Sequence, residues 1–147
     1  MFNLVFPSMQ NAKQVSMFFT LLQPSYHIKN SMTNKYRSHK CNEINVADVD
    51  KIVKLSGWVH RKRDHGNLLF IDLRDNYGIT QLVFSSDNPL LEQASHIKNE
   101  SVITIEGSVV KRTEETVNHT LPTGSVEVKV SSLIIESESE YLPLQVN

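Results

Sequence analysis

The chain has 147 residues, a formal net charge of −1 and 39% hydrophobic residues, which together predict one globular domain with an extension. A charge this close to zero indicates no partner by itself, so any affinity for nucleic acid has to come from a local patch. The single cysteine excludes an internal disulfide. No apolar run approaches the ~20 residues of a membrane span, so we expect no membrane contact.

Residues 1–31 differ in composition from the rest, with no Asp, Glu or Arg and with one apolar run, "VSMFFTLL". Three interpretations stay open: the true start is Met32, the segment is a targeting peptide, or it is a flexible extension. The lack of Arg and of a small-residue cleavage site weighs against targeting. We therefore expect a domain that folds without this leader, in the cytoplasm, or in the mitochondrion if the leader is a targeting peptide.

Hydrophobic alternation predicts five strands in the rest of the chain. They are residues 52–60, 68–75, 79–86, 101–112 and 125–137. Between the first two strands, the charged run "RKRDHGN" contains Gly66 and Asn67, which suit a tight turn. Residues 113–124 are typical of a polar loop, and residues 137–147 of a linker that contains Pro.

One helix is predicted within residues 87–100, between the third and fourth strands. Asn88 can cap it and Pro89 suits its first position. Its apolar stripe consists of Leu90, Leu91, Ala94 and Ile97. The resulting order of elements over residues 32–136 is that of a mainly β OB-fold, a five-stranded Greek-key barrel with one helix between strands 3 and 4. A five-stranded α+β sandwich remains the alternative, because periodicity alone does not exclude it.

Alternation also assigns one face of each strand to the barrel interior. The predicted interior residues are Val53, Leu55, Val59, Leu69, Ile71, Leu73, Thr80, Leu82, Phe84, Ile103, Ile105, Val109, Val126, Val128 and Val130. The opposite face then carries Phe70, Gln81, Arg112, Glu127 and Lys129, close to the basic run Arg61, Lys62 and Arg63. Proteins bind single-stranded nucleic acid with such sets, since rings stack on bases, amides and carboxylates read base edges, and cations contact phosphates.

Each of these residues also has a structural interpretation. Phe70 could pack under the loop 113–123, Gln81 could be a solvated strand residue, and the basic run 61–63 could be a solvated charged segment. The combination of all three on one face favours a nucleic-acid site.

Motifs for catalysis are absent from the sequence. It has no GxSxG, no Gly-rich phosphate loop, no HExxH and no CxxC, and its six His residues are scattered. We therefore predict no catalytic residue, no metal site and no cofactor in this chain.

The segments "KYRSHKCNEI", "VKLSGWVHRKRDHGNLLFIDLRDNYGITQLVF", "LPTGSVEV" and "YLPLQVN" resemble the N-terminal part of bacterial-type aspartyl-tRNA synthetases, from about Met32 to Asn147. The stretch "GWVHRKRDHGNLLFIDLRD" is specific for the class II synthetases for Asp, Asn and Lys, and "YGITQLVF" and "LPLQVN" point to the aspartyl member. The resemblance implies an OB-fold that binds the anticodon loop of aspartate tRNA.

The resemblance also implies roles for five residues. Phe70 matches the aromatic residue that stacks on the central anticodon uracil, Gln81 matches the amide that reads this base, and Arg63 matches an arginine beside it. Arg112 and Glu127 match positions that contact the flanking anticodon bases.

Two further cations, Arg61 and Lys62, are the expected contacts to the tRNA backbone. Lys62 stands where many relatives have Arg, which keeps the charge but loses the bidentate fork.

In the family that the chain resembles, a catalytic domain follows the linker, and its motifs for ATP, aspartate and the tRNA acceptor end are missing from this sequence. The resemblance implies a full-length homodimer that uses ATP and Mg²⁺ to attach aspartate to tRNA. This chain alone is then expected to be a monomer that binds tRNA and does not charge it. Two other functions stay open, a free-standing OB-fold protein for single-stranded nucleic acid and an interaction protein whose outer face docks another protein.

Overall fold

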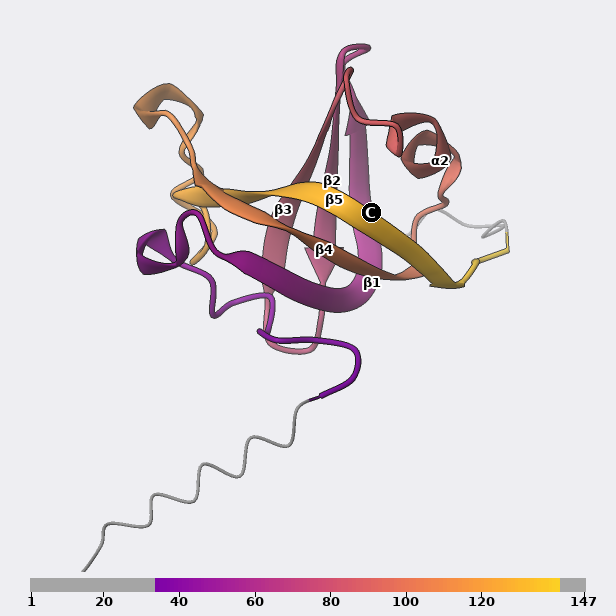
Figure 1. Cartoon of the computed structure of the whole chain (residues 1–147), viewed down its shortest axis with the longest axis horizontal. Coiled ribbons are helices and arrows are strands. Elements are labelled where there is room, and N and C mark those ends of the chain that lie inside the picture. The colour runs from indigo at the N-terminus through magenta and orange to yellow at the C-terminus, as the bar shows by residue number, and fades with distance from the viewer. Residues whose placement is uncertain (1–33, 141–147) are drawn as a thin grey trace, which may run out of the picture. The chain divides into compact units, whose positions relative to one another are not determined.

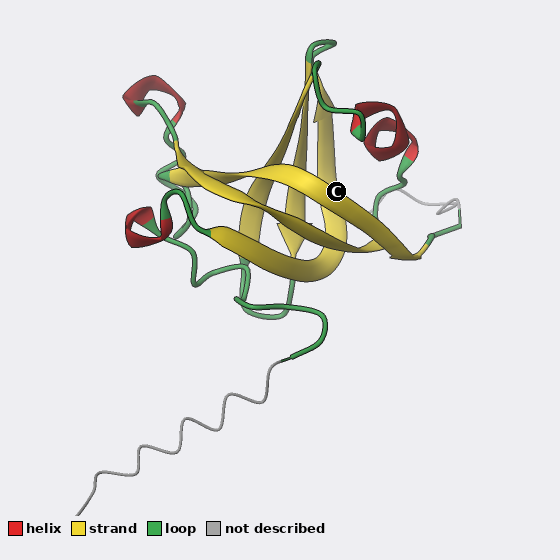
Figure 2. Cartoon of the chain, viewed as in Figure 1, coloured by secondary structure: helices red, strands yellow, loops and turns green. Residues whose placement is uncertain are grey.

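The computed structural model describes residues 34–140, so the expectations for the leader 1–31 and for residues 141–147 lie outside the described part. The elements are the short 3-10 helix η1 (Val46–Asp48), strands β1 (Ile52–Asp64), β2 (Leu68–Arg74) and β3 (Ile79–Ser85), helix α2 (Leu91–His96), strand β4 (Val102–Lys111), the 3-10 helix η2 (Glu114–Thr116) and strand β5 (Val126–Ser137) (Figure 2). This order is the predicted one, with the helix between the third and fourth strands.

The five strands close into a barrel in the order β1-β2-β3-β5-β4. β1 is long and strongly curved (Figure 1), and it pairs with β4 through Ile52–Trp58 and with β2 through Trp58–Asp64. Gly57 lies where β1 passes from one partner to the other, and a Cβ atom there would lie 2.3 Å from the backbone oxygen of Arg74. A short parallel pairing of β3 with β5 completes the ring. The barrel is confirmed and the α+β sandwich is excluded.

The barrel core agrees with the predicted alternation. Every residue predicted to face the interior is at most 2% exposed. The largest of them, Phe84, is fully buried, as are Leu69 and Ile71 of β2. Removing this much apolar surface from water is the main source of stability for a small β-barrel.

A β-bulge in β1 changes which side chains of the basic run face outward. Val59 pairs with Leu73, but the next pair is Arg61 with Asp72, so one residue of β1 is left over at this point. The extra residue shifts the alternation by one position. The strand also extends to Asp64, so the predicted turn starts later than expected and is shorter. Its Gly66 has a positive φ of 77°, as a tight turn requires.

The segment before β1 covers the end of the barrel at the β2–β3 turn, a role that the sequence did not predict. Cys41 and Ile44 are each 1% exposed and belong to the core. The Asp75 carboxylate fixes the segment, because it accepts hydrogen bonds from the backbone N–H of Cys41 at 3.0 Å and of Tyr77 at 2.7 Å. The Thr80 hydroxyl donates to the backbone oxygen of Cys41.

Helix α2 is shorter than the predicted range. It packs against β2 and β3 through its buried Ala94, and Ile97, directly after its last residue, is buried as well. Asn88 is not its formal N-cap, but its side chain accepts from the backbone N–H of Leu90 at 2.9 Å and donates to the backbone oxygen of Val130 at 2.7 Å. Asn88 therefore fixes the turn before the helix to β5.

Candidate nucleic-acid interface

An open pocket of about 350 Å³ lies on the outer face of the barrel, between the β1–β2 turn and the loop that joins β4 to β5. It is lined by Arg63, His65, Leu68, Phe70, Gln81, Lys111, Arg112, Thr113, Thr116 and Glu127. The lining contains all five residues to which the sequence assigned a role in reading the anticodon. They come from five different strands or strand ends, and the barrel closure brings them together.

Phe70 supplies the aromatic surface of the pocket. In the register it lies between Arg63 of β1 and Val83 of β3, and its ring is half-buried. The His65 ring approaches it edge-on, with 5.8 Å between ring centroids and 75° between ring planes. The Arg63 guanidinium carbon lies 5.9 Å from the Phe70 centroid, at the outer limit of a cation–π contact. The ring therefore borders an open space where a planar group can stack.

Gln81 faces outward as the alternation predicted, yet it is only 5% exposed. Its side-chain oxygen accepts a hydrogen bond from Arg63 Nη2 at 3.2 Å, and its Nε2 donates to Glu127 Oε2 at 3.0 Å. The interpretation of Gln81 as a solvated strand residue is therefore wrong. Side chains from β1 and β5 cover the amide and hold it in place.

Arg63 and Arg112 bring two guanidinium groups into the pocket, each beside a carboxylate. Arg63 Nη2 lies 2.7 Å from Asp72 Oδ1, and Arg112 Nε lies 3.8 Å from Glu127 Oε2. Among the described residues, Arg63 Nε and both Nε and Nη1 of Arg112 are buried without a hydrogen-bond partner. Buried N–H groups are normally paired, but the protein encloses these atoms, so they lie behind the pocket surface and are not open to a ligand.

Arg61 and Lys62 lie on different faces of β1. Arg61 pairs with Asp72, is exposed and faces outward, next to the site but outside the pocket lining. Lys62 pairs with the buried Ile71, and its ammonium donates to the backbone oxygens of Ile97, at 2.7 Å, and of Ser95 at the end of α2. Burial lowers the pKa of Lys62. The structure therefore does not bring Lys62 together with the other site residues.

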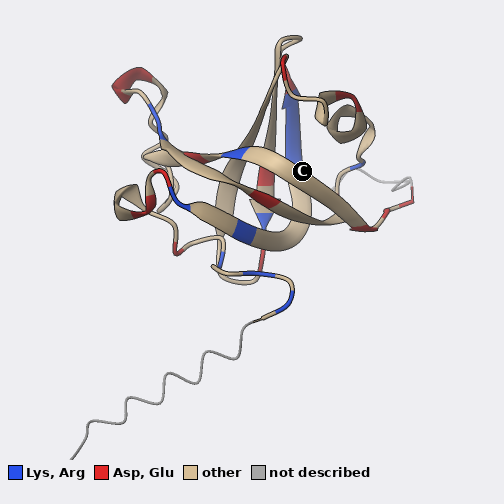
Figure 3. Ribbon diagram, in the orientation of Figure 1, with Lys and Arg blue, Asp and Glu red and all other residues tan. Residues whose placement is uncertain are grey.

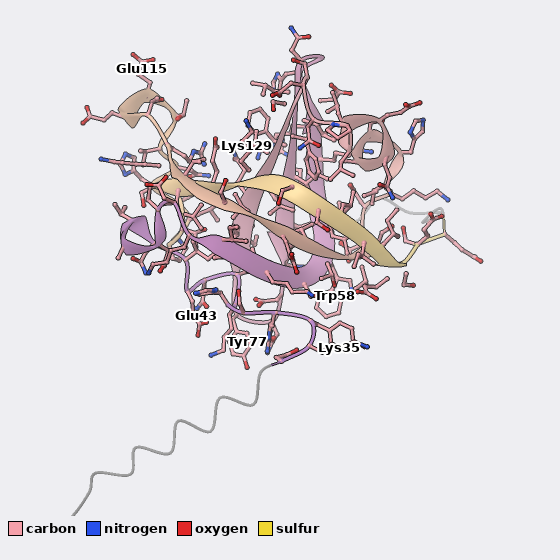
Figure 4. The ribbon with its side chains drawn as sticks, viewed as in Figure 1. Lys35, Glu43, Trp58, Tyr77, Glu115 and Lys129 are labelled. Carbon is pink, nitrogen blue, oxygen red and sulfur yellow. The ribbon has the colours of Figure 1, made fainter. Side chains whose placement is uncertain are left out.

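Charge is unevenly distributed around the pocket. Figure 3 shows basic residues along β1 toward the β1–β2 turn and acidic residues at η2. Glu114 and Glu115 are the acidic residues of η2, and Figure 4 shows Glu115 pointing away from the barrel at this tip. The labelled aromatic residues Trp58 and Tyr77 lie on the other side of the molecule in the same view. Exposed aromatic rings are thus present outside the site. Phe70 differs from Trp58 and Tyr77 because it lines the pocket together with Arg63 and Gln81.

Sequence reasoning missed one residue of the polar network, Asp72. It lies two positions after Phe70 on the same face of β2, so the alternation that singled out Phe70 also indicated Asp72. His65, Lys111, Thr113 and Thr116 were not assigned roles either, because nothing in the sequence shows that the two turns meet at one pocket.

Residues 34–140 contain neither a candidate metal cluster nor a helix that could span a membrane. No group of three or more His, Cys, Asp or Glu side chains in this range could hold a metal ion. No helix in it is long and apolar enough to cross a membrane.

The barrel and its pocket are typical of OB-fold domains that bind nucleic acid, and the sequence is similar to this class as well. Residues 53–136, more than half of the chain, match the family described as OB-fold nucleic acid binding domain. The chain therefore belongs to this family of tRNA anticodon-type OB-folds.

The relatives and solved structures to which the chain is similar include aspartyl- and asparaginyl-tRNA synthetases. The aspartate–tRNA(Asp/Asn) ligase of Rickettsia africae is 59% identical over 115 residues, which cover 78% of this chain and 19% of that protein. The aspartyl-tRNA synthetase of Entamoeba histolytica has a TM-score of 0.66 at 26% identity, over 78% of this chain and 23% of that one. The asparaginyl-tRNA synthetase of Pyrococcus horikoshii has a TM-score of 0.61 at 27% identity, over 73% of this chain and 24% of that one.

The chain thus matches the OB-fold domain of aspartate–tRNA ligases and spans about a fifth of the length of the curated relatives that it matches.

Proposed function

We propose that this chain binds the anticodon loop of aspartate tRNA and serves as the anticodon-recognition part of an aspartate–tRNA ligase. One observation carries the proposal, namely that Phe70, Arg63, Gln81, Arg112 and Glu127 line a single open pocket on the outer face of the barrel. A ring beside a polar, partly cationic floor suits an unpaired base, because the ring stacks on the base and the polar groups read its edge.

Within this function Phe70 stacks on the central uracil of the anticodon and Gln81 reads its edge, with Arg63 beside it. Arg112 and Glu127, which both line the pocket, contact the flanking bases. Arg61 contacts phosphate from the outer face. Lys62 can add only long-range attraction, since its ammonium is bonded to the end of α2.

The activity of the longer enzyme is part of the same proposal. The relatives' names describe ligation of tRNA, and the resemblance adds ATP-dependent attachment of L-aspartate, Mg²⁺ and a homodimer. These cofactors belong to the remaining four-fifths of such an enzyme. This chain alone is then a monomer that binds tRNA without charging it.

The proposal is tested by Phe70→Ala, measured as the Kd for a fluorescently labelled anticodon stem-loop of aspartate tRNA. We expect binding to weaken by about 1–3 kcal/mol, or roughly 5- to 150-fold, because one stacking platform is lost. The melting temperature should change little, since a half-buried ring at the surface contributes far less than the ~3–5 kcal/mol of a core Phe.

Trp58→Ala is the matched control, because Trp58 is an aromatic side chain that is 43% exposed and lies outside the pocket. It should leave the Kd unchanged. Equal losses in both variants, or no loss in Phe70→Ala, would contradict the proposed site. Equal affinity of the wild-type chain for the stem-loop and for an unrelated unpaired RNA would indicate a general single-strand binder instead.

A further inference from the structure

A continuous row of side chains runs through the pocket lining and one residue beyond it, and acidic and basic groups alternate in this row around one amide. The order is Asp72, Arg63, Gln81, Glu127 and Arg112, with neighbours 2.7, 3.2, 3.0 and 3.8 Å apart. Five strands or strand ends contribute to the row. Gln81 is its neutral centre, with a guanidinium at one end of the amide and a carboxylate at the other.

The two charged neighbours fix the orientation of the Gln81 amide. A Gln side chain can rotate about its last torsion and exchange its oxygen and nitrogen, and in water both arrangements are readily populated. Here such a rotation would turn the NH₂ group toward the Arg63 guanidinium and the oxygen toward the Glu127 carboxylate. Both contacts would change from attractive to repulsive in a site that is only 5% exposed at Gln81.

A fixed amide orientation has a direct consequence for base recognition. Uracil presents an N3–H donor next to the O4 acceptor, whereas cytosine presents an N3 acceptor next to the N4 amino donor. The two bases have the same shape and the opposite polarity at these two positions. For a base stacked in one position, an amide that pairs with uracil has to rotate by 180° to pair with cytosine.

We propose that Asp72 is a positioning residue that determines specificity for uracil at the central base. This inference rests on the proposed function. Asp72 lies directly across from Gln81 in the β2–β3 register, and its Oδ1 accepts from Arg63 Nη2 at 2.7 Å, the same nitrogen that donates to Gln81. Asp72 does not line the pocket. It therefore acts on the base through Arg63 and Gln81, without touching the RNA.

The contribution of Asp72 is separable from general electrostatics. Removing a carboxylate next to an RNA site weakens repulsion of the phosphates, which raises affinity for every RNA alike. Loss of the anchor for Arg63 instead lets the amide rotate, which lowers affinity for uracil relative to cytosine. The quantity that distinguishes the two effects is the ratio of the two Kd values.

The experiment measures Kd for two anticodon stem-loops that differ only in uracil or cytosine at the central position. The wild-type chain should prefer uracil. Asp72→Ala should reduce this preference by about tenfold, the size of one well-oriented bidentate base contact. Asp72→Asn keeps the shape and a weaker acceptor for Arg63, so the preference should fall in the same direction but by less. Melting curves establish that each variant is folded, and Asp72→Asn carries the test if Asp72→Ala unfolds.

Glu106→Ala is the control for charge, since Glu106 pairs with Lys54 at 3.3 Å on the outer face of β4, outside the pocket. It should leave the ratio unchanged. An unchanged ratio in the folded Asp72 variants, with a wild-type chain that prefers uracil, would overturn the role of Asp72 and leave the proposed function intact. A wild-type chain that binds neither loop, or binds both equally, would overturn both.

Discussion

The Cys41 thiol is a residue whose environment is set entirely by the fold. It is 1% exposed, and burial, together with the nearby Asp75 carboxylate, raises the pKa of the thiol to about 12. The ordinary value is 9.0, so the folded chain holds the proton of Cys41 more tightly than the unfolded chain does. The contribution of the neutral thiol to stability is thus fully present below about pH 9 and is lost progressively as the pH rises toward 12.

We predict that the wild-type chain loses stability relative to Cys41→Ala as the pH rises from about 9 toward 12. The difference in the free energy of unfolding should shrink by up to about 1.4 kcal/mol per pH unit above the unfolded pKa. Urea titrations of both proteins at several pH values measure it. Other titrating groups are common to both chains and cancel in the comparison. A difference that stays constant over this range would show that the thiol ionises as readily in the folded chain as in the unfolded one.

For Gln81, the alternation of apolar residues along β3 predicted the face on which the side chain lies but not its burial. Alternation correctly assigned it to the outer face, because Thr80 and Leu82 on either side of it are core residues. Its burial was not predictable, since the groups that cover it come from the other strands. Glu127 reaches it only because β3 and β5 pair in parallel, a contact between residues far apart in the sequence.

At the level of elements, Lys62 connects β1 to α2. The bonds from its ammonium to the backbone oxygens of Ser95 and Ile97 satisfy carbonyl groups that a helix end leaves unpaired. A helix of six residues has little stability of its own. This connection therefore holds α2 against the barrel.

Lys62→Met should destabilise the domain by about 1–3 kcal/mol, because hydrogen bonds from a charged group are lost and two carbonyls are left without this partner. Thermal melting measures the effect, and the affinity for the anticodon stem-loop should change little. Arg61→Met is the matched control, since the neighbouring cation is exposed on the outer face. It should weaken RNA binding at an unchanged melting temperature. The reverse pattern would mean that Lys62 contacts phosphate and that its bonds to α2 are dispensable.

The strands and the core were predictable because apolar alternation repeats over whole elements. The bulge in β1 was not, since no residue type there marks the extra position, yet it decides that Arg63 faces outward beside Phe70. The segment before β1 also escaped prediction, because Cys41 and Ile44 are isolated apolar residues without a period. Local pattern thus predicts the elements, while the irregularities that position the site depend on contacts across the barrel.

For the molecule as a whole, the small net charge of −1 limits the long-range electrostatic attraction between the protein and RNA phosphates. Most cations at the site are already engaged, Arg63 with Asp72, Arg112 with Glu127, and Lys62 with α2. The exposed cations on the outer face near the pocket are Arg61, Lys111 and Lys129. Base contacts therefore have a larger share in affinity than phosphate contacts, unlike in strongly basic RNA-binding proteins.

We predict a shallow salt dependence for binding to the anticodon stem-loop. Each neutralised phosphate contributes about −0.7 to −0.9 to the slope of log Kobs against log salt concentration, so two or three contacts give a slope of roughly −2. Arg61→Ala should reduce its magnitude by nearly one unit and leave the preference for uracil over cytosine unchanged, because a phosphate contact carries no sequence information. Titrations between low and moderate salt measure both quantities. A slope steeper than about −5 would mean that many more phosphates are contacted than these three cations can neutralise, and that a basic surface beyond the pocket dominates the affinity.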